Sequence, residues 1–126
     1  MSNPSKRKGT AAETKVVNYL ATFGIEAERR ALSGNADKGD IKVNYKGNEF
    51  TLEVKTGKQT ENPSRKQIEE WLRQTKVEST NASCSGALVV VRYRRAIKDA
   101  EVYIPGVYGS TFMYLDEFAK EGIRLM

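Results

Sequence analysis

The sequence contains no histidine and a single cysteine, Cys84. The absence of histidine excludes an imidazole general base, a Ser-His-Asp triad and zinc sites that rely on histidine ligands. One cysteine excludes an intramolecular disulfide and a thiolate zinc site within one chain, and it fits a reducing, cytoplasmic compartment. Any catalysis therefore has to use carboxylates, lysine, arginine, hydroxyl groups and a metal ion.

Long apolar runs and glycine-rich phosphate loops are also missing from the sequence. No segment approaches the about 20 apolar residues of a membrane-spanning helix. Residues 1–8 are polar and basic with no apolar stretch behind them, unlike a secretory signal. We therefore expect no membrane association and no nucleotide-binding loop of the Walker type.

The chain does contain many charges, with 21 lysines and arginines against 16 acidic residues, for a net charge of +5. Its 126 residues, 39% of them hydrophobic, suffice for one globular domain with a core. The positive excess favours an anionic partner such as nucleic acid. We expect a flexible basic arm at residues 1–8, in which Lys6, Arg7 and Lys8 suit phosphate contacts, and one domain at residues 9–126.

The most informative stretch covers residues 39–57. Apolar and polar residues alternate over residues 41–45 and again over residues 50–55, which predicts two strands. Gly47 and Asn48 lie between them and suit a two-residue hairpin turn. The sequence therefore predicts an antiparallel hairpin with one apolar face.

The polar face of this hairpin carries the candidate chemistry. With the turn at Gly47-Asn48, Ile41 faces Val54, and Asp40 lies opposite Lys55 and next to Glu53 on the other face. Two carboxylates suit Mg²⁺ or a similar hard cation, and an adjacent ammonium group could hold a phosphate or a water. Charged residues also alternate on ordinary solvated strands, so the hairpin alone leaves both interpretations open.

A helical pattern precedes the hairpin, at residues 10–23. Thr10 and Glu13 match a capping box at its start, and Gly24 is a typical stop. Glu13 lies at the end of the apolar stripe of this helix. It either caps the helix or reaches over the sheet as an additional metal ligand.

A second helical pattern follows Pro63 and runs to about Ser79. Ser64 and Gln67 match a second capping box, and Gln67 is either a cap partner or a polar group near the site. The inner side of this helix is predicted from the spacing of its apolar and small residues: Ile68, Trp71, Leu72 and Thr75.

Further elements complete an α/β pattern. We expect strands at residues 25–32, 86–93 and 100–104, a polar loop at residues 33–39 and a terminal helix at residues 114–120. The strand at residues 86–93 has a continuous apolar run, which indicates burial on both faces. This order predicts a mixed sheet covered by helices.

Three arginines follow that apolar run: Arg92, Arg94 and Arg95. They either contact DNA or belong to an ordinary solvated turn. The sequence pattern alone does not choose between these two interpretations.

The chain resembles the PD-(D/E)xK nuclease superfamily and, more narrowly, the archaeal-type Holliday junction resolvases and their phage relatives. The resemblance covers residues 8–93, with a weaker tail. The matching residues, in chain order, are Gly9 and Glu13, then Arg29 or Arg30, Ser33-Gly34, Asp40, Glu53-Val54-Lys55 and Gln67. One departure is that Gly39, and not proline, precedes Asp40.

The resemblance implies a restriction-endonuclease-like core in αβββαβ order, with an additional C-terminal strand and helix. It implies Mg²⁺, with Mn²⁺ as a substitute, held by Glu13, Asp40, Glu53 and the carbonyl of Val54. Glu13, Asp40, Glu53 and Lys55 would be the catalytic residues. DNA would be bound by Lys6, Arg7, Lys8, Arg29, Arg30, Ser33, Lys58 and Gln67.

The resemblance further implies a homodimeric endonuclease that resolves four-way DNA junctions by paired symmetric nicks in recombination and repair, in a prokaryotic cell or a phage-infected host. Exposed candidates for the dimer interface are Val107, Tyr108, Phe112, Met113 and Tyr114. Three alternatives stay open: an endonuclease of the same superfamily that acts on duplex or other branched DNA, a non-catalytic basic DNA-binding protein, and an RNA-processing role.

Overall fold

Within the residues that the computed structural model describes (4–30, 38–106 and 112–126, with only the backbone for 4–8), six strands form one sheet. The strands, in chain order and in the same order across the sheet, are β1 (Glu26–Arg29), β2 (Ile41–Tyr45), β3 (Asn48–Lys55), β4 (Ser85–Val90), β5 (Glu101–Tyr103) and β6 (Met113–Tyr114). β3 and β4 are parallel, and the other neighbouring pairs are antiparallel. The sheet is therefore mixed, as predicted.

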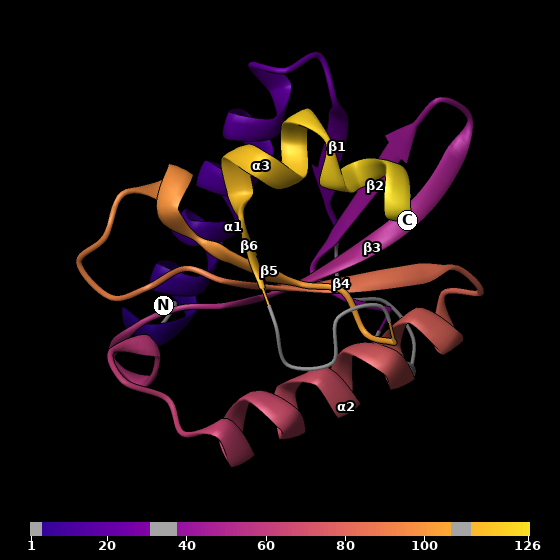
Figure 1. The fold of residues 1–126 in the computed structure, drawn as a ribbon. Coiled ribbons are helices and arrows are strands. Elements are labelled where there is room, and N and C mark those ends of the chain that lie inside the picture. The colour runs from indigo at the N-terminus through magenta and orange to yellow at the C-terminus, as the bar shows by residue number, and fades with distance from the viewer. Residues whose placement is uncertain (1–3, 31–37, 107–111) are drawn as a thin grey trace.

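Helices cover both faces of the sheet (Figure 1). α1 (Pro4–Ala21) and α3 (Leu115–Lys120) lie on one face, and α2 (Arg65–Asn81) lies on the other. Three short 3-10 helices are η1 (Lys58–Thr60), η2 (Ile97–Asp99) and η3 (Gly122–Leu125). In the described part of the chain, no helix is both long and apolar enough to span a bilayer.

Two hydrophobic clusters lie on the two faces of the sheet. The larger one, under α1 and α3, includes Val16, Leu20, Ile41, Leu52, Val89 and Phe118. The smaller one, under α2, consists of Ile68, Trp71, Leu88, Val90 and Tyr103, with Leu72 against it. Because β4 contributes side chains to both clusters, its apolar run is buried on both faces, which confirms the prediction.

The first helix begins earlier than predicted, at Pro4. Proline suits the first helical position because its fixed φ matches the helix and its missing N–H would have no partner there. Thr10 therefore lies inside α1, the predicted capping box with Glu13 is wrong, and residues 4–8 of the predicted arm have helical backbone. The division into a basic arm and a domain stays a prediction.

The end of α1 lies where the sequence predicts it. Gly24 has φ +75°, its N–H donates to the carbonyl of Ala21 at 3.0 Å, and the N–H of Ile25 donates to the carbonyl of Leu20 at 3.1 Å. These two bonds form a Schellman motif, in which glycine adopts the left-handed conformation at little cost.

The predicted hairpin is present, but its register is wrong by two residues. Ile41 pairs with Leu52, and the two turn residues are Lys46 and Gly47, with φ +50° and +82°. Positive φ at both positions matches the right-handed twist of the flanking strands. A shift of two residues leaves every side chain on its predicted face, because side chains alternate with a period of two.

The remaining strands are shorter than expected, and β6 was not predicted. β1 covers four residues of the expected strand at residues 25–32, β4 ends at Val90, and β5 has three residues. The terminal helix α3 is confirmed. Most of the polar loop at residues 33–39, including Ser33, lies outside the described residues.

α2 begins where the second capping box predicts it. Ser64 has extended backbone, and its hydroxyl accepts a hydrogen bond from the Gln67 N–H at 3.1 Å. We expect Ser64→Ala to lower the free energy of unfolding by about 1 kcal/mol, because this N–H loses its acceptor. Ser64→Asp retains an acceptor and should keep the wild-type stability. Urea denaturation measures both variants, and an unchanged midpoint for Ser64→Ala would contradict the cap.

Candidate active site

Asp40 lies immediately before β2 and is fixed against β3 by its backbone and its carboxylate. Its N–H donates to the carbonyl of Leu52 at 3.0 Å, and its own carbonyl accepts from the N–H of Arg30 at 2.8 Å. Its carboxylate oxygen Oδ2 accepts from the N–H of Val54 at 2.8 Å. Asp40 therefore lies against residues 52–54 and not opposite Lys55, which corrects the predicted register.

The backbone conformation at Gly39 explains why no proline precedes Asp40. Its φ is +93°, and a Cβ atom added there would clash with the Thr51 hydroxyl. That hydroxyl donates to the carbonyl of Lys38 at 2.7 Å, so the neighbouring backbone is closely packed. Proline has φ near −65° and cannot adopt this conformation. Proline at position 39 is therefore incompatible with the local backbone.

Glu53 is the most buried of the predicted acidic residues, with 5% of its surface exposed. The carboxyl groups of Asp40 and Glu78 lie within hydrogen-bonding range of its side chain. Burial raises the pKa of Glu53 to about 7; the interaction with Asp40 and the charge of Lys55 oppose this rise, whereas Glu78 adds to it. The ionised form of Glu53 is therefore disfavoured by its buried surroundings and by Glu78.

Lys55 lies two residues after Glu53 on the same face of β3. Its Nζ is 4.0 Å from Oε2 of Glu53, and 21% of its side chain is exposed. The ammonium group is thus next to the buried carboxylate and still reachable from solvent. The structure brings Asp40, Glu53 and Lys55 together, although through a register different from the predicted one.

Glu13 approaches this group from α1. Its carboxylate accepts a hydrogen bond from Nε of Arg29 at 3.1 Å, and Arg29 also donates to the Thr10 hydroxyl at 3.4 Å. Burial and, to a lesser degree, the charge of Asp40 raise the pKa of Glu13, whereas Arg29 lowers it. Glu13 is therefore within electrostatic range of Asp40, and Arg29 orients Glu13.

The other predicted DNA-binding residues differ in their exposure and in their contacts. Arg30 has 18% of its side chain exposed, and its guanidinium lies 3.6 Å from Glu49. Lys58 is exposed at the start of η1, and Gln67 has an exposed side chain while its N–H completes the cap of α2. The side chains of residues 6–8 and all of Ser33 lie outside the described residues.

Glu78 is a site residue that the sequence analysis missed. It lies on α2, is 6% exposed, and raises the pKa of Glu53. The sequence contains a pattern that indicates its burial. Glu78 follows Trp71 by seven residues and Thr75 by three, which places it on the inner side of the helix. An acidic residue at a predicted core position indicates a polar partner across the interface.

The donor set fits a hard divalent cation. Among the described residues, no three acidic, histidine or cysteine side chains are arranged to hold a metal ion together. Mg²⁺ does not require such a cage, because it commonly binds one or two carboxylates and completes its shell with waters and substrate phosphate oxygens. Asp40 and Glu53 offer two neighbouring carboxyl groups, and a cation bound there would compete with protons for them.

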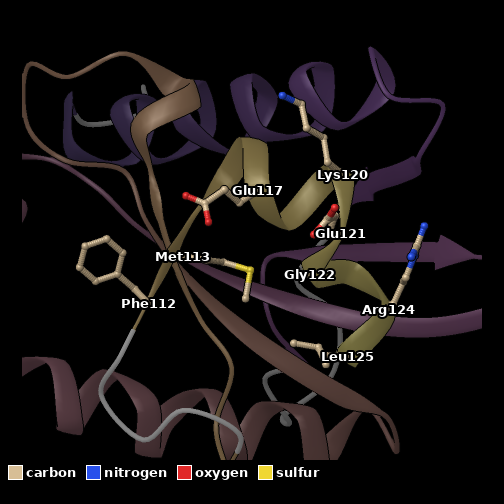
Figure 2. A pocket seen from close by; sticks show the side chains of 8 residues that line it. All are labelled: Phe112, Met113, Glu117, Lys120, Glu121, Gly122, Arg124 and Leu125. Carbon is tan, nitrogen blue, oxygen red and sulfur yellow. The ribbon is translucent and has the colours of Figure 1, made fainter.

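A pocket of about 760 Å³ lies elsewhere, between β6, α3 and η3 (Figure 2). Phe112, Met113 and Leu125 form its apolar part, and Lys120 and Arg124 project outward beside it. None of its lining residues belongs to the predicted site. The acidic group at the edge of β2 and β3 is therefore not part of this pocket.

Comparisons with known proteins concern the fold. No family model matches the sequence, and no curated protein is similar to it. Among solved structures, the chain is similar to Hjc of Archaeoglobus fulgidus, a Holliday junction resolvase from an archaeal hyperthermophile, with 18% identity, 75% of each chain covered and a TM-score of 0.50. The protein therefore has the α/β fold of the archaeal resolvase Hjc, a restriction-endonuclease-like sheet flanked by helices.

Proposed function

We propose that the protein is a Mg²⁺-dependent DNA endonuclease that resolves four-way junctions. The observation that carries the proposal is the group formed by Asp40, Glu53 and Lys55, in which two carboxyl groups are neighbours and the ammonium group lies 4.0 Å from Glu53. The fold shared with a Holliday junction resolvase supports the same activity. The excess of positive charge suits a polyanionic substrate.

Asp40 and Glu53, with the carbonyl of Val54, are the proposed ligands, and Glu13 joins them directly or through a water. A Mg²⁺ or Mn²⁺ ion held by these residues would supply Lewis-acid polarisation of the phosphate and a lower pKa for the attacking water. Lys55 orients that water and offsets the charge that builds up on the phosphate in the transition state. In-line attack leaves a 5′-phosphate and a 3′-hydroxyl.

The raised pKa of Glu53 makes this activity depend on pH. Near pH 7 the carboxyl group is partly protonated, because its pKa is about 7. Only the ionised carboxylate binds a cation, so cation binding displaces a proton. The apparent affinity for Mg²⁺ therefore rises as the pH increases through this range.

DNA would be held mainly through its backbone. The proposed phosphate contacts are Arg29, Arg30, the basic residues 6–8, Ser33, Lys58 and Gln67. Two symmetric nicks in a four-way junction require two sites, which a two-fold homodimer provides. Phe112 and Tyr114, at the β6 edge, are 38% and 43% exposed and are candidates for that contact.

Lys55→Ala should leave junction binding unchanged and lower the cleavage rate about 100-fold, because the phosphate loses one source of electrostatic stabilisation. Single-turnover cleavage with saturating protein measures this rate, and a mobility shift without divalent cation measures binding. Lys46→Ala, in the hairpin turn, is a matched control for the loss of one lysine on the same hairpin. Wild-type turnover by Lys55→Ala would remove this residue from the mechanism.

The substrate is tested by comparing a synthetic four-way junction with a linear duplex of the same arm sequence, each with and without Mg²⁺. We expect the junction to be cleaved at least about 100-fold faster than the duplex, corresponding to about 2.7 kcal/mol of discrimination. Equal rates on both substrates would favour an endonuclease that acts on duplex DNA.

A further inference from the structure

The chain that follows β4 lies directly beside the candidate active site. The N–H of Val91 donates to the carbonyl of Lys55 at 2.8 Å, and the Thr60 hydroxyl donates to the carbonyl of Val91 at 2.9 Å. Figure 1 shows the loops after β3 and after β4 at the same end of the sheet. Residues that follow Val91 therefore begin next to Lys55.

Arg92 anchors this segment to the body of the protein. Its guanidinium donates to the carbonyl of Glu61 at 3.0 Å and lies 3.4 Å from the carboxylate of Glu101. The N–H of Arg95 donates to the carbonyl of Arg92 at 3.0 Å and closes a turn. The guanidinium of Arg92 is thus engaged in contacts within the protein. These contacts fix the start of the turn at residues 92–95.

Arg94 and Arg95 have no such partners. Both are exposed, and within the described ranges neither forms an ion pair. The guanidinium of Arg94 lies over the ring of Tyr93, 5.0 Å from its centroid. This stacking restricts the side chain while its N–H groups can still reach a ligand.

The backbone at Arg94 is unusual for a residue with a side chain. Its φ is +61°, in the left-handed region that glycine adopts most readily. Glycine would fit this turn better, so arginine here is a local cost to the backbone. Conformations of this kind often occur where the side chain is needed for function.

We propose that Arg94 and Arg95 bind the phosphate backbone of the DNA strand beside the scissile phosphate. The turn would hold the strand on the β4 side of the acidic group, and Arg29 lies across that group on the β1 side. Contacts of this kind carry no base sequence, so the turn would contribute to binding of any DNA that reaches the site. This inference rests on the proposed function for the position of the strand.

The discriminating variant is Arg94→Gly. We expect it to weaken binding of a labelled four-way junction about 10-fold and to lower the salt dependence of binding by about one ion. We expect its thermal midpoint to equal or exceed that of the wild type, because glycine accepts the φ of +61°. Fluorescence anisotropy in EDTA at several salt concentrations measures binding without cleavage.

Arg94→Gln and Arg124→Gln form a matched pair that loses one charge each. Arg124 is exposed in η3, beside the pocket of Figure 2. We expect Arg94→Gln to reproduce the loss of affinity and Arg124→Gln to stay within about twofold of the wild type.

Equal affinities for this matched pair would overturn the inference, as would a wild-type protein that binds no DNA. A lower thermal midpoint together with lower affinity in Arg94→Gly would also overturn it, because the turn would then be merely structural. Since binding is measured in EDTA, a protein that binds but never cleaves refutes the proposed function and still tests the turn.

Discussion

Asp40→Asn and Glu53→Gln should each abolish metal-dependent cleavage of a four-way junction while junction binding survives. The expected loss is at least about 1,000-fold in the single-turnover rate, or about 4 kcal/mol. Each substitution replaces one of the two neighbouring carboxyl groups at the edge of β2 and β3. A neutral amide keeps the shape of the side chain but offers a weaker ligand to a hard cation.

The two variants differ in what else they disturb. Asparagine at position 40 can still accept the hydrogen bond from the N–H of Val54, so the local backbone should persist. Glutamine at position 53 is similar in size and can hydrogen-bond to the same neighbours without carrying a charge. Glu26→Gln, on the exposed side of β1, is the matched control and should cleave like the wild type. Full cleavage by either Asp40→Asn or Glu53→Gln would refute the site.

The stability of Glu53→Gln relative to the wild type should increase with pH in the absence of divalent cations. Burial raises the pKa of Glu53 from 4.5 to about 7, so folding favours the protonated carboxyl group. Its stabilising contribution is fully present below pH 4.5 and is lost as the pH rises through about 7. Glutamine has no proton to lose, so the variant avoids this loss.

The expected size of the effect follows from the shift in pKa. A change from 4.5 to about 7, at 1.36 kcal/mol for each pH unit, corresponds to about 3 kcal/mol between pH 4 and pH 8.5. Urea denaturation in EDTA at both pH values measures the difference between Glu53→Gln and the wild type. Subtracting the two proteins removes the titration of the other groups. A difference that does not change with pH would contradict a protonated Glu53 in the folded protein.

In the hairpin, the sequence predicts which face each side chain occupies but does not determine the register. Alternating apolar residues assign Asp40, Glu53 and Lys55 to one face. A shift of the strand register by two residues does not change this assignment. The register depends on the turn, and both Lys46-Gly47 and Gly47-Asn48 are plausible two-residue loops. The observed turn needs a lysine with φ +50°, which composition alone does not favour.

The sequence does not predict β6, and it misplaces the start of α1. β6 has two residues and pairs with β5 only through a contact between distant parts of the chain. The start of α1 was obscured because Thr10 and Glu13 match a capping box inside the helix. Glu78 was missed because the predicted inner side of α2 ends at Thr75. The order of helices and strands was predicted from longer sequence patterns, and the similarity to Hjc confirms the fold class.

In the proposed function, the acidic group of Asp40 and Glu53 cleaves phosphodiester bonds with the help of a divalent cation. The most direct measurement is denaturing electrophoresis of a 5′-labelled four-way junction incubated with the wild-type protein, with Mg²⁺, with Mn²⁺ and with EDTA. We predict symmetric nicks with 5′-phosphate ends in either cation and none in EDTA. A junction that is bound but stays intact in both Mg²⁺ and Mn²⁺ would contradict the claim and indicate a non-catalytic DNA-binding protein.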